Sequence, residues 1–151
     1  VATVDDDRVI VSGPELADGF EGSALVICND YEFELIRQKT SVDEESMLEH
    51  TQALVVTRGE EGCSIYTAAG RKDVPAVTPT RIVDPTGVGD AFRAGFMKGM
   101  SRSADHEVCA RMGAVAATYA LEHLGGQSHA YTWAEFHARY EASFGPTGVR
   151  Q

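Results

Sequence analysis

Two short, continuous apolar runs are the feature that most constrains how this chain can fold. Residues 24–28 read Ala-Leu-Val-Ile-Cys, and residues 53–57 read Ala-Leu-Val-Val-Thr. Apolar runs of this length without polar alternation are typical of strands that are buried on both faces. Capped segments with helical periodicity follow them, as at residues 105–124, which begin with Asp and place apolar residues on one face. This alternation predicts an α/β fold with a mainly parallel sheet.

Composition narrows the class of protein. The 151 residues are enough for one domain with a hydrophobic core. A formal net charge of −10 argues against non-specific binding to nucleic acid or to an anionic membrane surface. No apolar run approaches the roughly 20 residues that a membrane span needs, and the first residues lack the pattern of a signal peptide. Cys28, Cys63 and Cys109 are scattered and lack metal-ligand spacing, which fits a reducing cytosol. We therefore expect a cytoplasmic protein whose partners are neither nucleic acids nor membranes.

A turn rich in small residues carries the strongest chemical signal. Residues 84–90 read Asp-Pro-Thr-Gly-Val-Gly-Asp and run into a helical segment. Glycine brings backbone N–H groups close to an anion, and a helix N-terminus adds the positive end of its dipole. The amides of Gly87, Val88 and Gly89 are therefore predicted to form an anion hole for a transferring phosphoryl group. Asp90 is the predicted general base, which accepts the proton of the attacking hydroxyl. The alternative is that Asp90 is only a helix N-cap after a glycine turn.

A second candidate site directly follows the second apolar run. Residues 57–62 read Thr-Arg-Gly-Glu-Glu-Gly. Ligands in open α/β sheets bind outside the carboxyl ends of strands. The hydroxyl of Thr57 and the amides of Gly59 and Gly62 are therefore candidates for contact with the phosphates or ribose of a nucleotide. The alternative interpretation is a hairpin loop between two strands.

A third candidate site follows the first apolar run. Asn29 and Glu32 lie three residues apart at the predicted start of a helix, so both can face one side and hold a hydrated Mg²⁺ through water. The alternative is an N-cap with its capping-box glutamate. A metal site, a nucleotide loop and an anion hole with a base are together the requirements of phosphoryl transfer. The chain has no GxxxxGK[ST] pattern, which excludes a P-loop enzyme.

These three motifs resemble the signatures of the ribokinase-like (PfkB) carbohydrate kinases. Residues 84–92 resemble that family's D-T-x-G-A-G-D-x-F signature, with Pro85 and Val88 in place of the usual Thr and Ala. Residues 29–32 match its N-x-x-E motif, and residues 57–62 resemble its T-x-G-x-x-G nucleotide loop. The order and approximate spacing also agree. The resemblance implies a three-layer α/β/α fold.

The resemblance also implies a role for each matching position. Asp90 becomes the base that deprotonates the acceptor hydroxyl, and Asn29 and Glu32 organise Mg²⁺ and the phosphates. Asp84 and Thr86 match positions beside the anion hole where family members often bind a monovalent cation, which here would be K⁺. ATP is assigned to a set of backbone and hydroxyl positions: Thr57, Gly59, Gly62, Gly87, Gly89 and Gly113.

Within the family, residues 29–32, 84–95 and 125–127 are most similar to bacterial adenosine kinases. The implied activity is ATP-dependent phosphorylation of a nucleoside or sugar hydroxyl, and most directly of adenosine to AMP. A ribokinase- or fructokinase-type sugar kinase remains an alternative. So does a nucleotide-binding remnant without catalytic activity.

The resemblance further implies that part of the kinase is absent. Whole family members are roughly twice as long, and their N-terminal half carries the acceptor-binding residues and a β-sheet lid. Residues 1–151 would then be the C-terminal ATP-binding and catalytic part, with the N-terminal part and its lid missing. That missing half becomes the expected partner, and the isolated chain is expected to show little activity. The resemblance also allows a homodimer.

Overall fold

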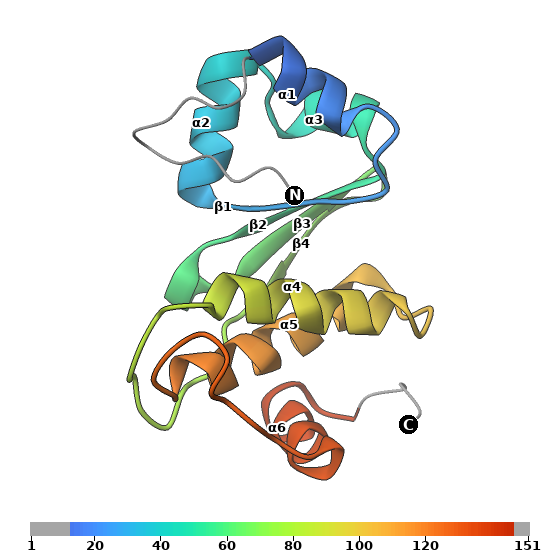
Figure 1. The fold of residues 1–151 in the computed structure, drawn as a ribbon. Coiled ribbons are helices and arrows are strands. Elements are labelled where there is room, and N and C mark those ends of the chain that lie inside the picture. The colour runs from blue at the N-terminus through green and yellow to red at the C-terminus, as the bar shows by residue number, and fades with distance from the viewer. Residues whose placement is uncertain (1–12, 147–151) are drawn as a thin grey trace. The chain divides into compact units, whose positions relative to one another are not determined.

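A computed structural model describes residues 13–146. They form two compact units, one of residues 13–59 and 63–73 and the other of residues 60–62 and 74–146, and each is described by itself. The elements in chain order are α1 (Gly13–Phe20), β1 (Val26–Asn29), α2 (Asp30–Thr40), α3 (Glu44–His50), β2 (Ala53–Thr57), the 3₁₀ turn η1 (Gly59–Glu61), β3 (Cys63–Thr67), β4 (Gly70–Val74), α4 (Val88–Met100), α5 (His106–Leu121) and α6 (Trp133–Phe144) (Figure 1). Among the described helices, none combines the length and the hydropathy that a membrane crossing requires.

The first unit is built on a sheet with the strand order β1-β2-β3-β4. Strands β1 and β2 are parallel, with Val26 opposite Leu54, whereas β2 and β3 are antiparallel, with Ala53 opposite Thr67. The α/β class is therefore confirmed, and the described part of the sheet is mixed. Only residues 58–62 connect β2 to β3, and parallel pairing would need a crossover of a dozen or more residues.

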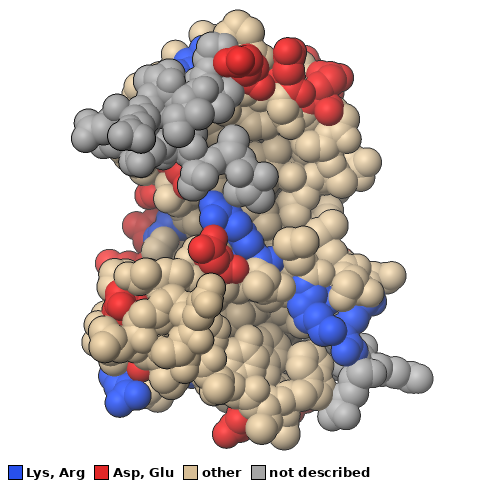
Figure 2. All heavy atoms as spheres, viewed as in Figure 1, with Lys and Arg blue, Asp and Glu red and all other residues tan. Residues whose placement is uncertain are grey.

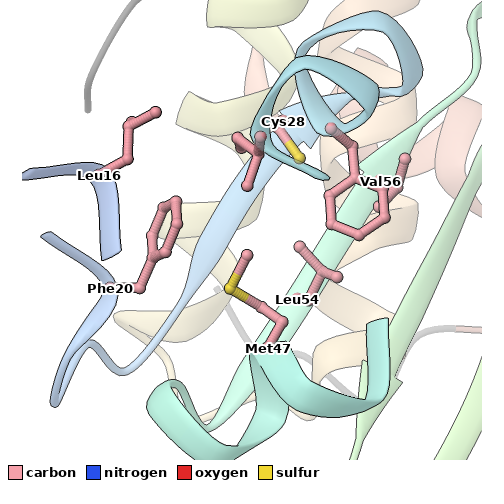
Figure 3. Packing of buried hydrophobic residues seen from close by; sticks show 8 residues of the cluster. Leu16, Phe20, Cys28, Met47, Leu54 and Val56 are labelled. Carbon is pink, nitrogen blue, oxygen red and sulfur yellow. The ribbon is translucent and has the colours of Figure 1, made fainter. Parts of the chain in front are cut away.

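The core of the first unit lies between this sheet and helices α1, α2 and α3. Leu54 and Val56 of β2 point into it, and Met47 of α3 is fully buried against them (Figure 3). Leu16 and Phe20 bring α1 to the same cluster. Val55, which alternates to the opposite face of the strand, is also fully buried. The prediction that residues 53–57 form a strand buried on both faces is confirmed.

The second unit is a helical assembly in which α4 and α5 pack very closely. A Cβ atom on Gly95 would lie 2.7 Å from the carbonyl oxygen of Met112, and one on Gly113 would lie 2.8 Å from that of Phe92. Phe136 and Tyr140 of α6 complete the core against α5. The two backbones can approach this closely only because both helices carry glycine at the contact.

Helix α5 begins where the sequence predicts but ends earlier. Asp105 is its N-cap, and the Asp105 carboxylate accepts a hydrogen bond from the N–H of Val108 at 2.8 Å. The helix ends at Leu121 rather than near residue 124. Glu122 is the C-cap, and its side chain turns to Thr80 and Arg139. Because of these long-range hydrogen bonds, the helix ends before it reaches Gly125 and Gly126.

Candidate active site

The turn before α4 has the geometry that its glycine predicts. The N–H of Val88 donates to the carbonyl of Pro85 at 3.3 Å, and Gly87 has φ 79° and ψ 1°. These are the dihedral angles of the third residue in a type II turn, a position that favours glycine. Gly87 is also the N-cap of α4, and it offers no side-chain cap. No cap side chain therefore competes with an anion for the first N–H groups of this helix.

The three predicted anion-hole donors differ in whether their N–H groups already have an acceptor within the protein. The N–H of Val88 already has the Pro85 carbonyl as an acceptor, although the bond is long. A bound phosphoryl group would have to compete with that bond. Gly89 lies in the first turn of α4, and a Cβ atom there would meet nothing within 4 Å. No other part of the described protein therefore fills the space on the Cβ side of Gly89.

Asp90 lies inside the first turn of α4 and is not its N-cap. The helix begins at Val88, so the alternative interpretation of Asp90 as a cap is wrong. The Asp90 side chain is 85% exposed, and the Arg93 guanidinium donates to its Oδ1 at 3.2 Å. An exposed carboxylate beside an uncapped helix N-terminus suits a base that meets an incoming hydroxyl group. Sequence reasoning missed Arg93, which the spacing of three residues from Asp90 would have suggested.

Asp84 fastens the turn to a loop that is distant in the sequence. Its Oδ1 accepts from the N–H of Thr86 at 2.9 Å, and its Oδ2 accepts from the N–H of Gly125 at 2.8 Å. The pKa of the Asp84 carboxyl is below its usual value. The largest cause is the hydrogen bond from the Thr86 N–H, and the Thr86 side chain and the Gly125 N–H add to it. A Cβ atom on Gly87 would lie 2.6 Å from the Cα of Gly126, so the two glycine backbones are in contact. The carboxylate can accept another partner besides these donors, so the predicted cation role of Asp84 and Thr86 stays compatible with this geometry.

The first residues of the other two motifs lie next to each other in the first unit. Asn29 and Thr57 are register partners at the carboxyl ends of the parallel strands β1 and β2. The Thr57 hydroxyl donates to the carbonyl of Cys28 at 3.4 Å, which ties it to the neighbouring strand. The predicted Mg²⁺ and nucleotide motifs thus lie at one edge of one sheet, where ligands of α/β proteins bind.

Asn29 and Glu32 form a reciprocal capping box. The N–H of Glu32 donates to Asn29 Oδ1 at 2.6 Å, and the N–H of Asn29 donates to Glu32 Oε2 at 2.9 Å. The alternative interpretation of this pair, an N-cap with its capping-box glutamate, is therefore confirmed. The two roles are compatible, because amide and carboxylate oxygens can accept more than one hydrogen bond. Within residues 13–146, no three His, Cys, Asp or Glu side chains gather as a metal site. The role of this pair in holding a hydrated Mg²⁺ through water stays a prediction.

The loop after β2 joins antiparallel strands, as the hairpin alternative required. Gly59 has φ 54°, and a Cβ atom there would meet nothing within 4 Å, so its backbone is open. Gly62 has φ 89°, and a Cβ atom there would lie 2.1 Å from the carbonyl of Val74. Gly62 is therefore needed for packing, whereas the space beside Gly59 on its Cβ side is empty. Arg58 of this loop donates to the hydroxyl of Ser64 at 2.5 Å, a contact that the sequence motif did not reveal.

Gly113 has a structural explanation of its own. It is buried where α5 meets α4, with the Phe92 carbonyl and ring against it. Close helix packing accounts for glycine here, and its predicted contact with ATP stays a prediction.

The predicted residues are divided between the units: Asn29, Glu32, Thr57 and Gly59 belong to the first, and Gly62, the turn 84–90 and Gly113 belong to the second.

Net charge does not prevent an anion site. The face shown in Figure 2 carries Lys and Arg side chains as well as acidic ones. The formal charge of −10 therefore does not make that face uniformly negative. An uncapped helix N-terminus can attract a phosphate locally whatever the total charge.

Comparison with known proteins agrees with the motifs. Residues 7–133 match the pfkB family carbohydrate kinases. The nucleoside kinase of Methanocaldococcus jannaschii is 32% identical over 126 residues, which are 83% of this chain and 42% of that protein.

Solved structures give the same result. The nucleoside kinase of Burkholderia thailandensis in complex with inosine has a TM-score of 0.88 and 37% identity, over 90% of this chain and 45% of that one. The adenosine kinase of Sinorhizobium meliloti has a TM-score of 0.67 and 26% identity, over 76% of this chain and 36% of that one. This chain spans less than half the length of each of these relatives. With its family match and its glycine turn, the chain belongs to the pfkB family of carbohydrate kinases.

Proposed function

We propose that these residues form the ATP-binding and catalytic part of a nucleoside kinase, which transfers the γ-phosphoryl group of ATP to a nucleoside hydroxyl. The observation that carries this proposal is the N-terminus of α4. There, Gly87 leaves the helix without a side-chain cap, and the exposed carboxylate of Asp90 lies in the first turn. The proposed anion site at Gly87 and the proposed base Asp90 are thus three residues apart at one end of α4.

In the proposed reaction, the Asp90 carboxylate takes the proton of the acceptor hydroxyl as its oxygen attacks the γ-phosphorus. The new bond forms as the bond from the γ-phosphorus to the bridging oxygen of ADP breaks, and ADP leaves. The backbone N–H groups of Gly87 and Gly89 stabilise the charge on the transferring phosphoryl oxygens, with Val88 contributing if its turn bond opens. Arg93 holds the Asp90 side chain from one turn further along α4.

The donor side of the proposal uses the remaining motifs. Thr57, Gly59 and Gly62 contact ATP, and Asn29 and Glu32 hold Mg²⁺ through water. Mg²⁺, when bound, neutralises charge on the phosphate oxygens. We further propose that Asp84 and Thr86 contribute to a site for K⁺ beside the turn.

The acceptor is proposed to be a purine nucleoside, with adenosine as the first candidate. The support is the resemblance of residues 84–95 to adenosine kinases and the structural likeness to a nucleoside kinase that binds inosine. Relatives that share 32% to 37% identity are called nucleoside kinases, which broadens the proposal beyond adenosine alone. Since the chain spans 45% of that inosine-binding relative, most of the acceptor site is proposed to lie outside these 151 residues.

A steady-state kinase assay of the full-length protein tests this proposal. It measures ADP release with Mg²⁺-ATP and with adenosine, inosine, cytidine, ribose or fructose as the acceptor. We expect the highest kcat/KM with a purine nucleoside. A preference for ribose or fructose would establish the sugar-kinase alternative instead, and ATP binding without turnover of any acceptor would establish the non-catalytic one.

A further inference from the structure

Glu122 is a buried carboxylate that the proposed chemistry does not use. It is 6% exposed at the C-terminal end of α5. Its Oε1 accepts from the N–H of Thr80 at 2.6 Å and from the Thr80 hydroxyl at 2.9 Å. The Arg139 guanidinium of α6 forms a two-pronged ion pair with it, at 2.5 Å to Oε1 and 2.8 Å to Oε2. A buried charge with partners from separate segments needs all of them, because losing one leaves the charge uncompensated.

Thr80 begins the segment that leads into the glycine turn. Along this segment, the chain is fastened to residues 121–126 at successive points. The Arg81 side chain donates to the carbonyl of Glu122 at 3.1 Å, and the N–H groups of Val83 and Asp84 donate to the carbonyl of Leu121 at 2.9 and 3.3 Å.

We call residues 80–87, with their row of contacts to residues 121–126, the strap, and it continues to the predicted anion hole. Asp84 accepts from the N–H of Gly125 at 2.8 Å, and the backbone of Gly87 lies against that of Gly126. The Glu122–Arg139 ion pair is at one end of this row of contacts, and the predicted phosphoryl-binding turn is at the other. All of the contacts lie within the second unit.

Arg139 is itself held firmly. Its guanidinium lies over the ring of Tyr119, 4.5 Å from the centroid, and its side chain is only 15% exposed. Tyr119 belongs to α5 and Arg139 to α6, so the ion pair locks the end of α5 to α6. A strap that ends on two packed helices can hold a turn more rigidly than a free loop would.

We propose that Glu122 and Arg139 are positioning residues for the anion hole: their ion pair anchors residues 80–87 against residues 121–126 and thereby sets the position of the Gly87 and Gly89 amides. This inference rests on the proposed function for its catalytic consequence. Its structural content, which is the coupling between the ion pair and the turn, is independent of that function.

The test compares Glu122→Gln with Glu107→Gln in the full-length protein. Glutamine keeps the size of the side chain but removes the charge that Arg139 needs. Glu107 pairs with Arg111 on the same helix, and neither residue takes part in the strap. Glu107→Gln is therefore a matched control for loss of an α5 ion pair.

The first readout is amide hydrogen exchange, which needs no turnover. Glu122→Gln should speed exchange at Val83, Asp84 and Gly125 by about tenfold or more, while Glu107→Gln should leave these amides unchanged. Equal exchange in both variants would overturn the proposal. If Glu122→Gln does not fold, Arg139→Lys, which keeps the charge but loses the two-pronged geometry, is used for the same comparison.

The second readout is kinetic. At a temperature where both variants are folded, Glu122→Gln should lower kcat by about tenfold, with the KM for ATP nearly unchanged, because misplaced donors affect the transition state most. If Glu122→Gln is less stable but keeps the wild-type kcat, the positioning role is overturned. If the wild-type protein transfers no phosphate at all, the proposed function fails, and the exchange experiment still decides the coupling.

Discussion

Asn29 and Thr57 are register partners at the carboxyl ends of neighbouring parallel strands, although they belong to different sequence motifs. Asn29 also caps α2 in a reciprocal box with Glu32. The same side chains therefore serve the fold and the proposed Mg²⁺ site. Conservative substitutions can separate the two roles, because Gln preserves a capping box while it removes the carboxylate charge.

We expect Glu32→Gln to raise the Mg²⁺ concentration that gives half-maximal activity, with little change in the free energy of unfolding. Asn29→Ala should instead destabilise the protein by about 0.5–2 kcal/mol through loss of the cap. Metal titration of activity and urea denaturation measure the two effects. Glu135→Gln alters the equivalent capping box of α6 with Thr132 and serves as the control. The Mg²⁺ role is refuted if the two Glu→Gln variants have the same metal dependence.

Asp90 is exposed at the uncapped end of α4, so its substitution should affect chemistry and not folding. Asp90→Asn should lower kcat by about 10²- to 10⁴-fold, the usual contribution of a general base, while ATP still binds. Single-turnover kinetics and calorimetric titration with ATP give the two values. Asp105→Asn is the matched control, because Asn caps helices as well as Asp does. Unchanged turnover in Asp90→Asn would remove the base from the mechanism.

Gly87 and Gly125 have the same φ of 79° but different surroundings. Alanine at either position should lower the free energy of unfolding by about 1–2 kcal/mol, because a residue with a Cβ disfavours the left-handed backbone conformation. At Gly87 the new Cβ would also lie 2.6 Å from Gly126, whereas at Gly125 nothing lies within 4 Å. Gly87→Ala should therefore be the more destabilising of the two in thermal unfolding, and it should also lose activity. Equal destabilisation would mean that the Gly87–Gly126 contact relaxes without cost.

Glu122 should make stability depend on pH at the acid end. The hydrogen bond from Arg139, which is the largest effect, and those from Thr80 outweigh burial and lower the pKa of Glu122 from 4.5 to about 2. Because the folded-state pKa is lower than the unfolded one, this stabilisation is present above pH 4.5 and is lost as the pH falls toward about 2. Relative to Glu122→Gln, the wild-type protein should lose up to about 3 kcal/mol of stability over that range. Urea denaturation at several pH values measures the difference, and a difference that does not vary with pH contradicts the assignment.

The parts of this site that local sequence patterns encode were predictable. The turn 84–90 and the strand ends at Asn29 and Thr57 follow from glycine chemistry and from apolar runs, which act over a few residues. The antiparallel pairing of β2 and β3 could also have been inferred, since five residues cannot form a crossover. The contacts of Asp84 with Gly125 and of Glu122 with Thr80 could not, because each joins residues about forty positions apart without any local periodicity.

Gly89 and Gly113 are both predicted to contact ATP, but they differ in the space that a Cβ atom would meet. Gly113→Ala places a Cβ atom 2.8 Å from the Phe92 carbonyl, so it should destabilise the protein by about 1–3 kcal/mol through overpacking between α4 and α5. Gly89→Ala meets nothing within 4 Å and lies in a helical turn, so its stability should match or exceed that of the wild type by up to about 1 kcal/mol. Alanine keeps the backbone N–H group, so this stable variant should lose kcat only if its methyl group occupies space that the transferring phosphoryl group needs. Thermal unfolding combined with steady-state kinetics separates the two glycines, and a fully active Gly89→Ala would show that the phosphoryl group does not need the space beside the Gly89 Cα.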